Sequence, residues 1–103
     1  MLYEGVITKP VYRVLTGLTQ ENRPEIALSV ALKELLRLKL NEAREQQQTF
    51  ESKYGVSFDS FKRAWNADEI EDRYSYQVER DYWEWEAAVT DESRLSEMAM
   101  QLL

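Results

Sequence analysis

The feature that most constrains the fold is the stretch between Pro24 and Gly55, which contains no other glycine or proline. Proline just inside the start and glycine just past the end are typical of a helix. Asn22 is the expected capping residue. Within the stretch, one set of residues recurs at steps of four and three, which is the spacing of a helix face. This stripe consists of Leu28, Leu32, Leu36, Leu40, Ala43, Gln47, Phe50 and Tyr54. At about 1.5 Å per residue, we expect one helix about 45 Å long.

A second apolar face is present in the first half of this expected helix, over residues 26–40. It consists of Val30, Ala31, Leu35 and Leu38. These residues point to another side of the helix than the first stripe. A helix that packs against a single neighbour needs only one apolar stripe. We therefore expect this half to pack against the N-terminal segment, a second subunit or both.

The clearest break in the helical pattern is the corner Lys53-Tyr54-Gly55-Val56-Ser57-Phe58-Asp59-Ser60-Phe61. Gly55 can adopt the left-handed conformation that ends a helix. Ser57 can cap the next helix, and Asp59 would lie in its first turn, where negative charge is favourable. We expect a short helix over about residues 58–66. It would present Phe58, Phe61 and Trp65.

A second long helix is expected in the C-terminal part, starting between Glu69 and Tyr76. Its apolar stripe consists of Tyr74, Val78, Tyr82, Trp85, Val89, Leu95, Ala99 and Leu102, with an interruption at Glu92. Two long helices joined by a short helical corner predict an all-α fold with an antiparallel hairpin. We expect residues 1–103 to form a single helical domain, with an N-terminal arm or short helix at 1–21 and the hairpin at 22–103. Because such a hairpin is thin, we expect a homodimer that forms a helical bundle.

The N-terminal segment has two interpretations. Residues 1–8 can form a short strand or an irregular arm, and a short helix can run from Pro10 to about Gly17. Together with the long helix, residues 3–40 loosely match a ribbon-helix-helix module that binds DNA. Its available contacts would be Thr8, Lys9, Arg13, Arg23 and Lys33. We favour the other interpretation, a helical brace for the long helix, and expect no nucleic-acid binding outside residues 3–40.

The composition narrows the chemistry that the chain can perform. The absence of histidine and cysteine removes the commonest general base, the commonest transition-metal ligand and all thiol chemistry. Three scattered glycines form no phosphate-binding loop. No apolar run is long enough to cross a bilayer, and the first residues do not read as an export signal. We therefore expect a cytoplasmic, non-enzymatic protein without a cofactor.

Charge is distributed unevenly along the chain, whose net charge is −6. Residues 68–97 contain eleven acidic side chains and three arginines, a net charge of −8. Residues 1–67 contain eight acidic and ten basic side chains, a net charge of +2. The C-terminal third is therefore an acidic arm, which repels nucleic acid and attracts a basic protein surface.

Aromatic and acidic side chains are concentrated in one part of this arm, Asp81-Tyr82-Trp83-Glu84-Trp85-Glu86-Ala87-Ala88-Val89. Helical spacing places Tyr82 and Trp85 on the core face. Trp83 lies two positions from Trp85, so it must point elsewhere. Aromatic anchors surrounded by carboxylates are suited to a basic partner. The expected partner-binding residues are Asp81, Trp83, Glu84, Glu86 and Thr90.

A second acidic pattern suggests an alternative function. Glu42 and Glu45 are three residues apart, and Glu69 and Asp72 repeat the spacing. The pattern resembles the Glu-x-x-Glu and Glu-x-x-Asp signature of the all-α nucleotide pyrophosphohydrolases. That resemblance implies four carboxylates holding Mg²⁺, a cation that prefers oxygen ligands. The second pair falls at an expected helix boundary, whereas the family needs it within a helix. A purely structural helical dimer is a further alternative.

Two segments of the chain together resemble a known group of proteins. They are the corner at residues 53–61 and Glu79-Arg80-Asp81-Tyr82-Trp83-Glu84-Trp85-Glu86-Ala87. They resemble a group of short bacterial and archaeal helical proteins often considered antitoxin-like, over about residues 25–90. The resemblance implies a protein that binds and masks a toxin, such as an RNA-cleaving one. A nuclease holds nucleic acid on a basic surface, so the acidic arm favours the same expectation.

Overall fold

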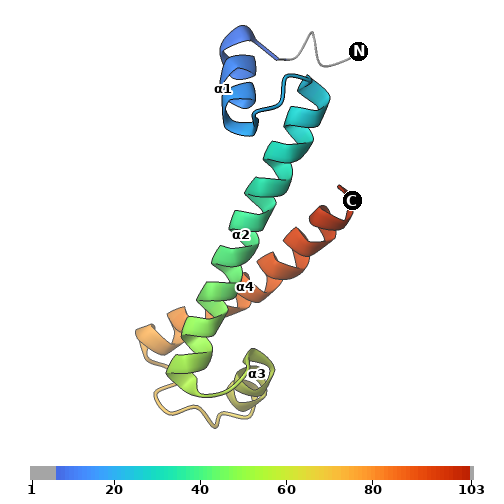
Figure 1. Cartoon of the computed structure of the whole chain (residues 1–103). Coiled ribbons are helices and arrows are strands. Elements are labelled where there is room, and N and C mark those ends of the chain that lie inside the picture. The colour runs from blue at the N-terminus through green and yellow to red at the C-terminus, as the bar shows by residue number, and fades with distance from the viewer. Residues whose placement is uncertain (1–6, 103) are drawn as a thin grey trace.

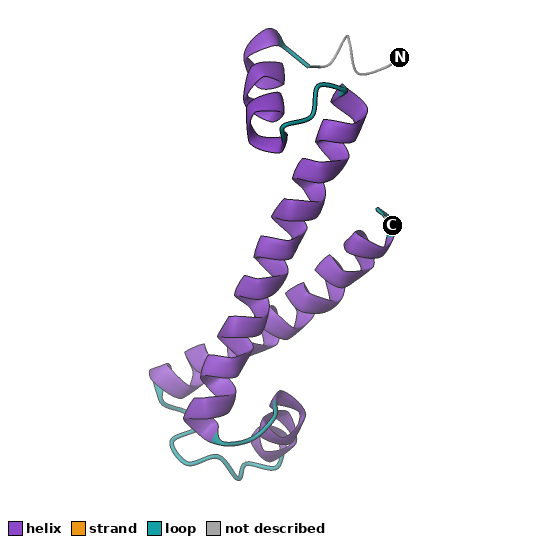
Figure 2. Ribbon diagram, viewed as in Figure 1, coloured by secondary structure: helices purple, strands orange, loops and turns teal. Residues whose placement is uncertain are grey.

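Residues 7–102 are described by the computed structural model, and these residues form four α-helices and no strand (Figures 1 and 2). The helices are α1 (Lys9–Thr19), α2 (Pro24–Tyr54), α3 (Phe58–Asn66) and α4 (Tyr76–Met100). α2 and α4 form the long hairpin, and α3 lies at the corner between them (Figure 1). The all-α class and the helical hairpin are therefore confirmed. The strand considered for residues 1–8 falls mainly outside the described residues.

α2 is the single long helix that the stretch without internal glycine or proline predicts. It spans 31 residues, with Pro24 in its first turn. The expectation that Asn22 caps it is wrong, because the backbone N–H of Ala27 donates to the carbonyl of Arg23 at 2.8 Å. Arg23 is therefore the residue that precedes the helix. The Asn22 carbonyl instead accepts a hydrogen bond from the Tyr12 hydroxyl at 2.6 Å.

The corner between α2 and α3 forms as its sequence predicts. Gly55 has a left-handed φ of 71°, and its N–H donates to the carbonyl of Glu51 at 2.7 Å. The Ser57 hydroxyl accepts a hydrogen bond from the backbone N–H of Ser60 at 3.3 Å, which caps α3. The left-handed glycine and the serine cap therefore end α2 and start α3 within three residues. α3 then presents its apolar side chains to the hairpin.

An aromatic core joins α2, α3 and α4 next to this corner. Its buried members are Phe50, Phe58, Phe61, Tyr82 and Trp85. Trp85 is fully buried, and its ring centroid lies 5.1 Å from that of Phe61 and 5.6 Å from that of Phe50. Removing an aromatic side chain from such a core costs about 3–5 kcal/mol, which makes this cluster a major source of stability. The prediction that Tyr82 and Trp85 face the core is confirmed.

α4 begins later than its apolar stripe suggests. The Ser75 hydroxyl accepts a hydrogen bond from the backbone N–H of Val78 at 3.3 Å, so the helix starts at Tyr76. Tyr74 lies in the preceding turn with most of its side chain exposed. Its assignment to the core stripe is therefore wrong, because the cap ends the helical register before that residue.

A polar contact between the long helices accounts for the interruption of the stripe at Glu92. The Glu92 carboxylate accepts hydrogen bonds from Arg44 Nε at 2.7 Å and from Gln47 Nε2 at 3.3 Å. Both hydrogen bonds lower the pKa of the Glu92 carboxyl, and the one from Arg44 has the larger effect. A polar group on this apolar face is thus paired rather than left unsatisfied.

α1 packs back against the start of α2 (Figure 1). Leu15 of α1 and Ala27 of α2 are both buried. α1 runs from Lys9 to Thr19, slightly longer than the expected helix, and it braces the end of the hairpin that lies far from the corner.

The molecule is elongated, with extents of 57 × 24 × 22 Å. Its two long helices meet near the corner and diverge towards the C-terminal end of α4 (Figure 2). Among the helices described, none has the length and apolar character needed to cross a membrane.

Candidate functional site

The two faces of α4 are used in different ways. Tyr82 and Trp85 point into the aromatic core, whereas 59% of Trp83 is exposed. Helical geometry requires this division, since residues two positions apart in a helix face different directions. Trp83 is a large apolar ring on the outside of the molecule, as its position in the sequence predicts.

Trp83 lies in a shallow surface depression of about 320 Å³ on α4. The depression is lined by Tyr76, Glu79, Arg80, Trp83 and Glu84, which we call the acidic aromatic surface. Glu79, Arg80 and Trp83 follow Tyr76 by three, four and seven positions, and Glu84 follows Arg80 by four, so the five residues share one side of the helix. Two rings and two carboxylates are therefore presented together on a single rigid element.

An ion pair crosses this surface. Arg80 Nε donates to Glu84 Oε1 at 2.8 Å, and both side chains are exposed. The hydrogen bond to Glu84 raises the pKa of Arg80, so the guanidinium stays charged. Exposed pairs of this kind contribute little to stability. Glu84 can therefore exchange Arg80 for another cation at little cost.

The Trp83 ring contacts one member of the aromatic core, Tyr82. The ring meets Tyr82 edge-on, with centroids 5.2 Å apart and planes at 89°. Burial raises the pKa of the Tyr82 hydroxyl, and the negative charge of Glu86, four residues further along α4, adds to the shift. Thr90 is exposed one turn further along α4. Glu86 and Thr90 therefore lie outside the depression, on the continuation of the same helix.

Asp81 differs from the other expected partner-binding residues, because only 3% of it is exposed. Its carboxylate accepts hydrogen bonds from Lys53 Nζ, from the Tyr54 hydroxyl at 2.5 Å and from Gln77 Nε2 at 3.0 Å. Burial alone would raise the pKa of the Asp81 carboxyl, but the hydrogen bonds from Lys53 and Tyr54 outweigh it and lower the pKa. Asp81 therefore ties α4 to the end of α2.

The two segments that carry the antitoxin-like resemblance meet in the fold. Lys53 and Tyr54 from the corner bind Asp81, and the ring centroid of Phe58 lies 5.8 Å from that of Tyr82. Most of the shared pattern therefore consists of residues that build the corner. Trp83 occupies the variable position of the Asp-Tyr-x-Glu-Trp-Glu motif, and Glu84 is a motif residue whose side chain is exposed.

The four carboxylates that the pyrophosphohydrolase resemblance implies lie on two different parts of the fold. Glu42 and Glu45 are exposed on α2, whereas Glu69 and Asp72 lie in the connection between α3 and α4. Asp72 has a left-handed φ of 57°, so the second pair does not sit within a helix. Across residues 7–102, no three acidic side chains form a group that could hold a metal ion.

Sequence reasoning missed three members of the acidic aromatic surface, namely Tyr76, Glu79 and Arg80. The start of α4 was the obstacle, because it could not be placed more closely than residues 69–76. Ser75 carries the signal that resolves it, since serine followed by an apolar segment is a helix-start pattern. Once α4 starts at Tyr76, helical spacing puts Tyr76 and Trp83 on the same face.

Comparison with known proteins places the chain in a family. No curated protein and no solved structure shows significant similarity to it. A family model described as "Uncharacterized protein MJ0235 family" matches residues 11–103, which include most of α1 and the whole hairpin. The chain therefore belongs to the MJ0235 family.

Proposed function

We propose that this protein is a non-enzymatic, antitoxin-like binding protein that masks a basic partner with the acidic aromatic surface of α4. The observation that carries the proposal is the exposed Trp83 ring beside Tyr76, Glu79 and Glu84 in one depression. Single exposed apolar residues are common, but aromatic rings are enriched at the centre of protein interfaces, and charged groups suit the polar rim around them. The surface continues towards Glu86 and Thr90.

An arginine or lysine side chain is the group that suits this surface. Its cation can lie over the ring of Trp83 or Tyr76, and it can pair with Glu79 or Glu84. Its apolar stem can cover the rest of the ring. Because the present contact between Arg80 and Glu84 is exposed, a partner's cation can replace Arg80 without a large loss of free energy.

The buried face of α4 supports this role by making the helix rigid before a partner arrives. Trp85 and Tyr82 are held by the aromatic core, and Asp81 is held by three hydrogen bonds. A preorganised surface loses little conformational entropy on binding, which improves affinity. The contacts that hold the buried face of α4 therefore also fix the positions of the side chains on its exposed face.

The class of partner follows from charge and from the antitoxin-like resemblance. Residues 68–97 carry a net charge of −8, which accelerates the approach of a basic protein. An RNA-cleaving toxin has a basic surface for its substrate, and covering that surface would inactivate it. We infer that the protein acts in this way in the cytoplasm, as a homodimer.

The proposal is tested by co-expressing the tagged chain with the products of the reading frames beside its own gene. We expect the chain to retain a basic protein, to lose it at high salt because screening weakens charge attraction, and to suppress its toxicity. Trp83→Ala and Glu84→Lys should each reduce the retained amount strongly. Both positions are at least partly exposed, so the variants should fold like the wild type.

Two matched variants serve as controls. Tyr74→Ala removes an exposed aromatic ring outside α4, and Glu45→Lys reverses an exposed acidic charge on α2. Both should retain the partner as well as the wild type does. If no protein is retained, or if Glu84→Lys and Glu45→Lys behave alike, the proposal is wrong and a purely structural helical dimer becomes the better description.

A further inference from the structure

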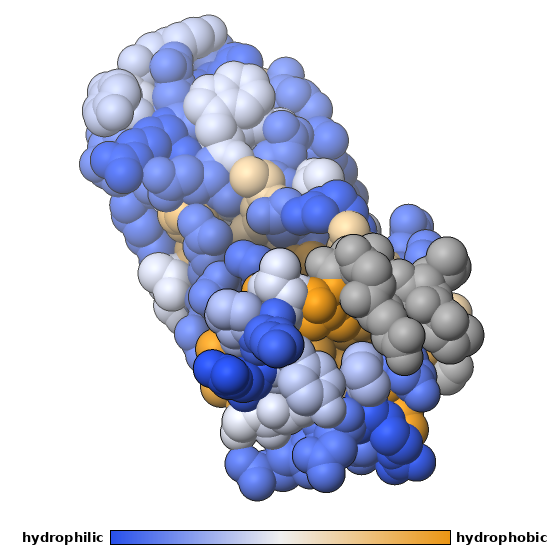
Figure 3. All heavy atoms as spheres, turned by 90° about the horizontal axis from the view of Figure 1, so that it is seen from above, coloured by the Kyte–Doolittle hydropathy of each residue, from blue (hydrophilic) through white to orange (hydrophobic). Residues whose placement is uncertain are grey.

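A band of exposed apolar side chains lies at the opposite end of the hairpin from the corner. It consists of Leu18, Val30, Leu32, Leu35, Leu38 and Met98, and we call it the apolar band. Seen from the end that carries α1, apolar surface is visible among polar side chains (Figure 3). The acidic aromatic surface shares no residue with this band, so the proposed function does not account for it.

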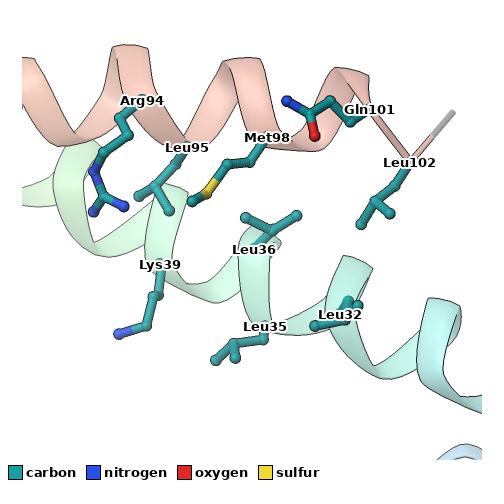
Figure 4. A pocket seen from close by; sticks show the side chains of 9 residues that line it. All are labelled: Leu32, Leu35, Leu36, Lys39, Arg94, Leu95, Met98, Gln101 and Leu102. Atoms are coloured by element: carbon teal, nitrogen blue, oxygen red, sulfur yellow. The ribbon is translucent and has the colours of Figure 1, made fainter.

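Two hollows lie in the apolar band, one on each side of α2. Where α2 and α4 diverge, a groove of about 450 Å³ opens between Leu32 and Leu36 on one side and Leu95, Met98 and Leu102 on the other (Figure 4). A second hollow, of about 740 Å³, lies between α1 and α2 beside Val30 and Leu38. Leu35 lines both, so the apolar surface is continuous across the first half of α2.

The exposed surface exceeds that of a compact monomer by more than one copy contributes to a stable interface. The chain exposes 7718 Å², whereas a compact monomer of 12.2 kDa exposes about 6,100 Å². The excess is about 1,600 Å², and each partner in a stable interface contributes only about 800 Å². The radius of gyration is 19.5 Å, against about 13 Å for a compact domain of this length.

Charge disfavours the basic partner as the occupant of this band, and the excess exposed surface favours a second copy. The charged residues that line the two hollows are mainly basic: Lys33, Glu34, Arg37, Lys39 and Arg94. A basic protein would meet like charges there. Glu34 already pairs with Arg37 in the same copy. Antiparallel pairing of two α2 helices, with the two-fold axis between Leu35 and Leu36, would place Glu34 of one copy opposite Arg37 of the other.

We propose that two copies of this chain associate through the apolar band, with the first halves of their α2 helices antiparallel and Leu35 near the two-fold axis. Both copies then bury the same side chains, as an isologous interface requires. α1 and the end of α4 flank the contact. The two acidic aromatic surfaces stay outside the interface, on the corner side of each copy.

This proposal rests on the homodimer of the proposed function and names its interface; purified full-length protein, with no partner present, tests it separately from the masking of a partner. We expect light scattering during size-exclusion chromatography to give about twice the monomer mass of 12.2 kDa. Val30→Glu and Leu35→Glu should shift the protein to the monomer. Val56→Glu is the matched control, because Val56 and Val30 are both 42% exposed and only Val30 belongs to the band. The control should remain dimeric, and circular dichroism should show that all variants keep their helices.

Cross-linking gives a second readout that does not depend on loss of association. The chain has no cysteine, so a single introduced cysteine reports on its own surroundings. Leu35→Cys should form an intermolecular disulfide under mild oxidation, because its copies would meet across the axis. Val56→Cys should not. A monomeric wild type, a dimer that survives Leu35→Glu, or equal cross-linking of both cysteine variants would each overturn the proposal.

Discussion

At the scale of single residues, Asp81 shows how a carboxylate in an acidic helix can serve the fold. It is buried and accepts hydrogen bonds from Lys53, Tyr54 and Gln77. We expect Asp81→Asn to lower the free energy of unfolding by about 1–3 kcal/mol, since hydrogen bonds to a buried charged group are lost or weakened. Urea denaturation measures this change. Asp91→Asn, on the exposed part of the same helix, should cost less than about 0.5 kcal/mol; equal losses would contradict the structural role of Asp81.

The same carboxylates make stability depend on pH. The folded state lowers the pKa of Asp81 from its ordinary value of 3.8 and that of Glu92 from 4.5. In this range the unfolded chain binds more protons than the folded one, so acid favours unfolding. We expect stability from these groups to be complete above about pH 5 and to fall as the pH drops below 4.5 towards the lower folded pKa values.

Unfolding midpoints measured between neutral and acidic pH test this expectation. A variant with both Asp81→Asn and Glu92→Gln should lose part of the decline at low pH, although it is less stable at neutral pH. Glu45→Gln, at an exposed position of α2, should keep the wild-type pH profile. The assignment of these pKa shifts is wrong if the double variant declines with pH as steeply as the wild type.

At the scale of helices, two glycines provide a direct comparison. Gly55 ends α2 with a φ of 71°, and open space surrounds the position of an added Cβ. Gly55→Ala should therefore cost about 1–2 kcal/mol through backbone conformation alone. Gly17 lies within α1, also with open space around it, so Gly17→Ala should stabilise the protein by about 0.5–1 kcal/mol. Thermal or urea unfolding that gives both variants the same sign would contradict this account of the corner.

Local signals made most of the helices predictable. The stretch without internal glycine or proline, Gly55 and Ser57 each act through a few neighbouring residues, and the structure places α2 and α3 accordingly. The cap at Asn22 and the core position of Tyr74 were predicted wrongly. At each of these boundaries, more than one residue can mark the start of the helix. Tertiary and sequence-local contacts decided the outcome: the Asn22 carbonyl binds Tyr12, and Ser75 caps α4.

The candidate site was only partly predictable for a related reason. Helical spacing separates Trp83 from Trp85, so the exposure of one ring and the burial of the other could be foreseen. Spacing does not reveal that Lys53 and Tyr54 reach Asp81, since that contact spans the corner of the hairpin. Asp81 was therefore expected among the exposed acidic residues, although the fold uses it internally.

At the scale of the whole molecule, two surfaces of different character lie at different ends of the hairpin. The apolar band surrounds the first half of α2, and the acidic aromatic surface lies on the first half of α4, near the corner. Such separation lets a dimer and a partner complex exist together, because neither interface competes for the other's residues. We expect Leu35→Glu, which should give a monomer, to retain the ability to bind the partner. Pull-down with this variant measures that independence, and loss of binding would show that the two surfaces are coupled.

The most direct test of the account is the affinity of the purified partner for the wild type and for Trp83→Ala, measured by calorimetry at low and high salt. We predict that Trp83→Ala weakens binding at least about thirtyfold, because truncation of an interface hot spot costs about 2 kcal/mol or more. High salt should weaken binding of the wild type further, since the acidic arm attracts its partner by charge. Equal affinities for the wild type and Trp83→Ala, with no dependence on salt, would contradict the claim that the acidic aromatic surface of α4 binds a basic protein.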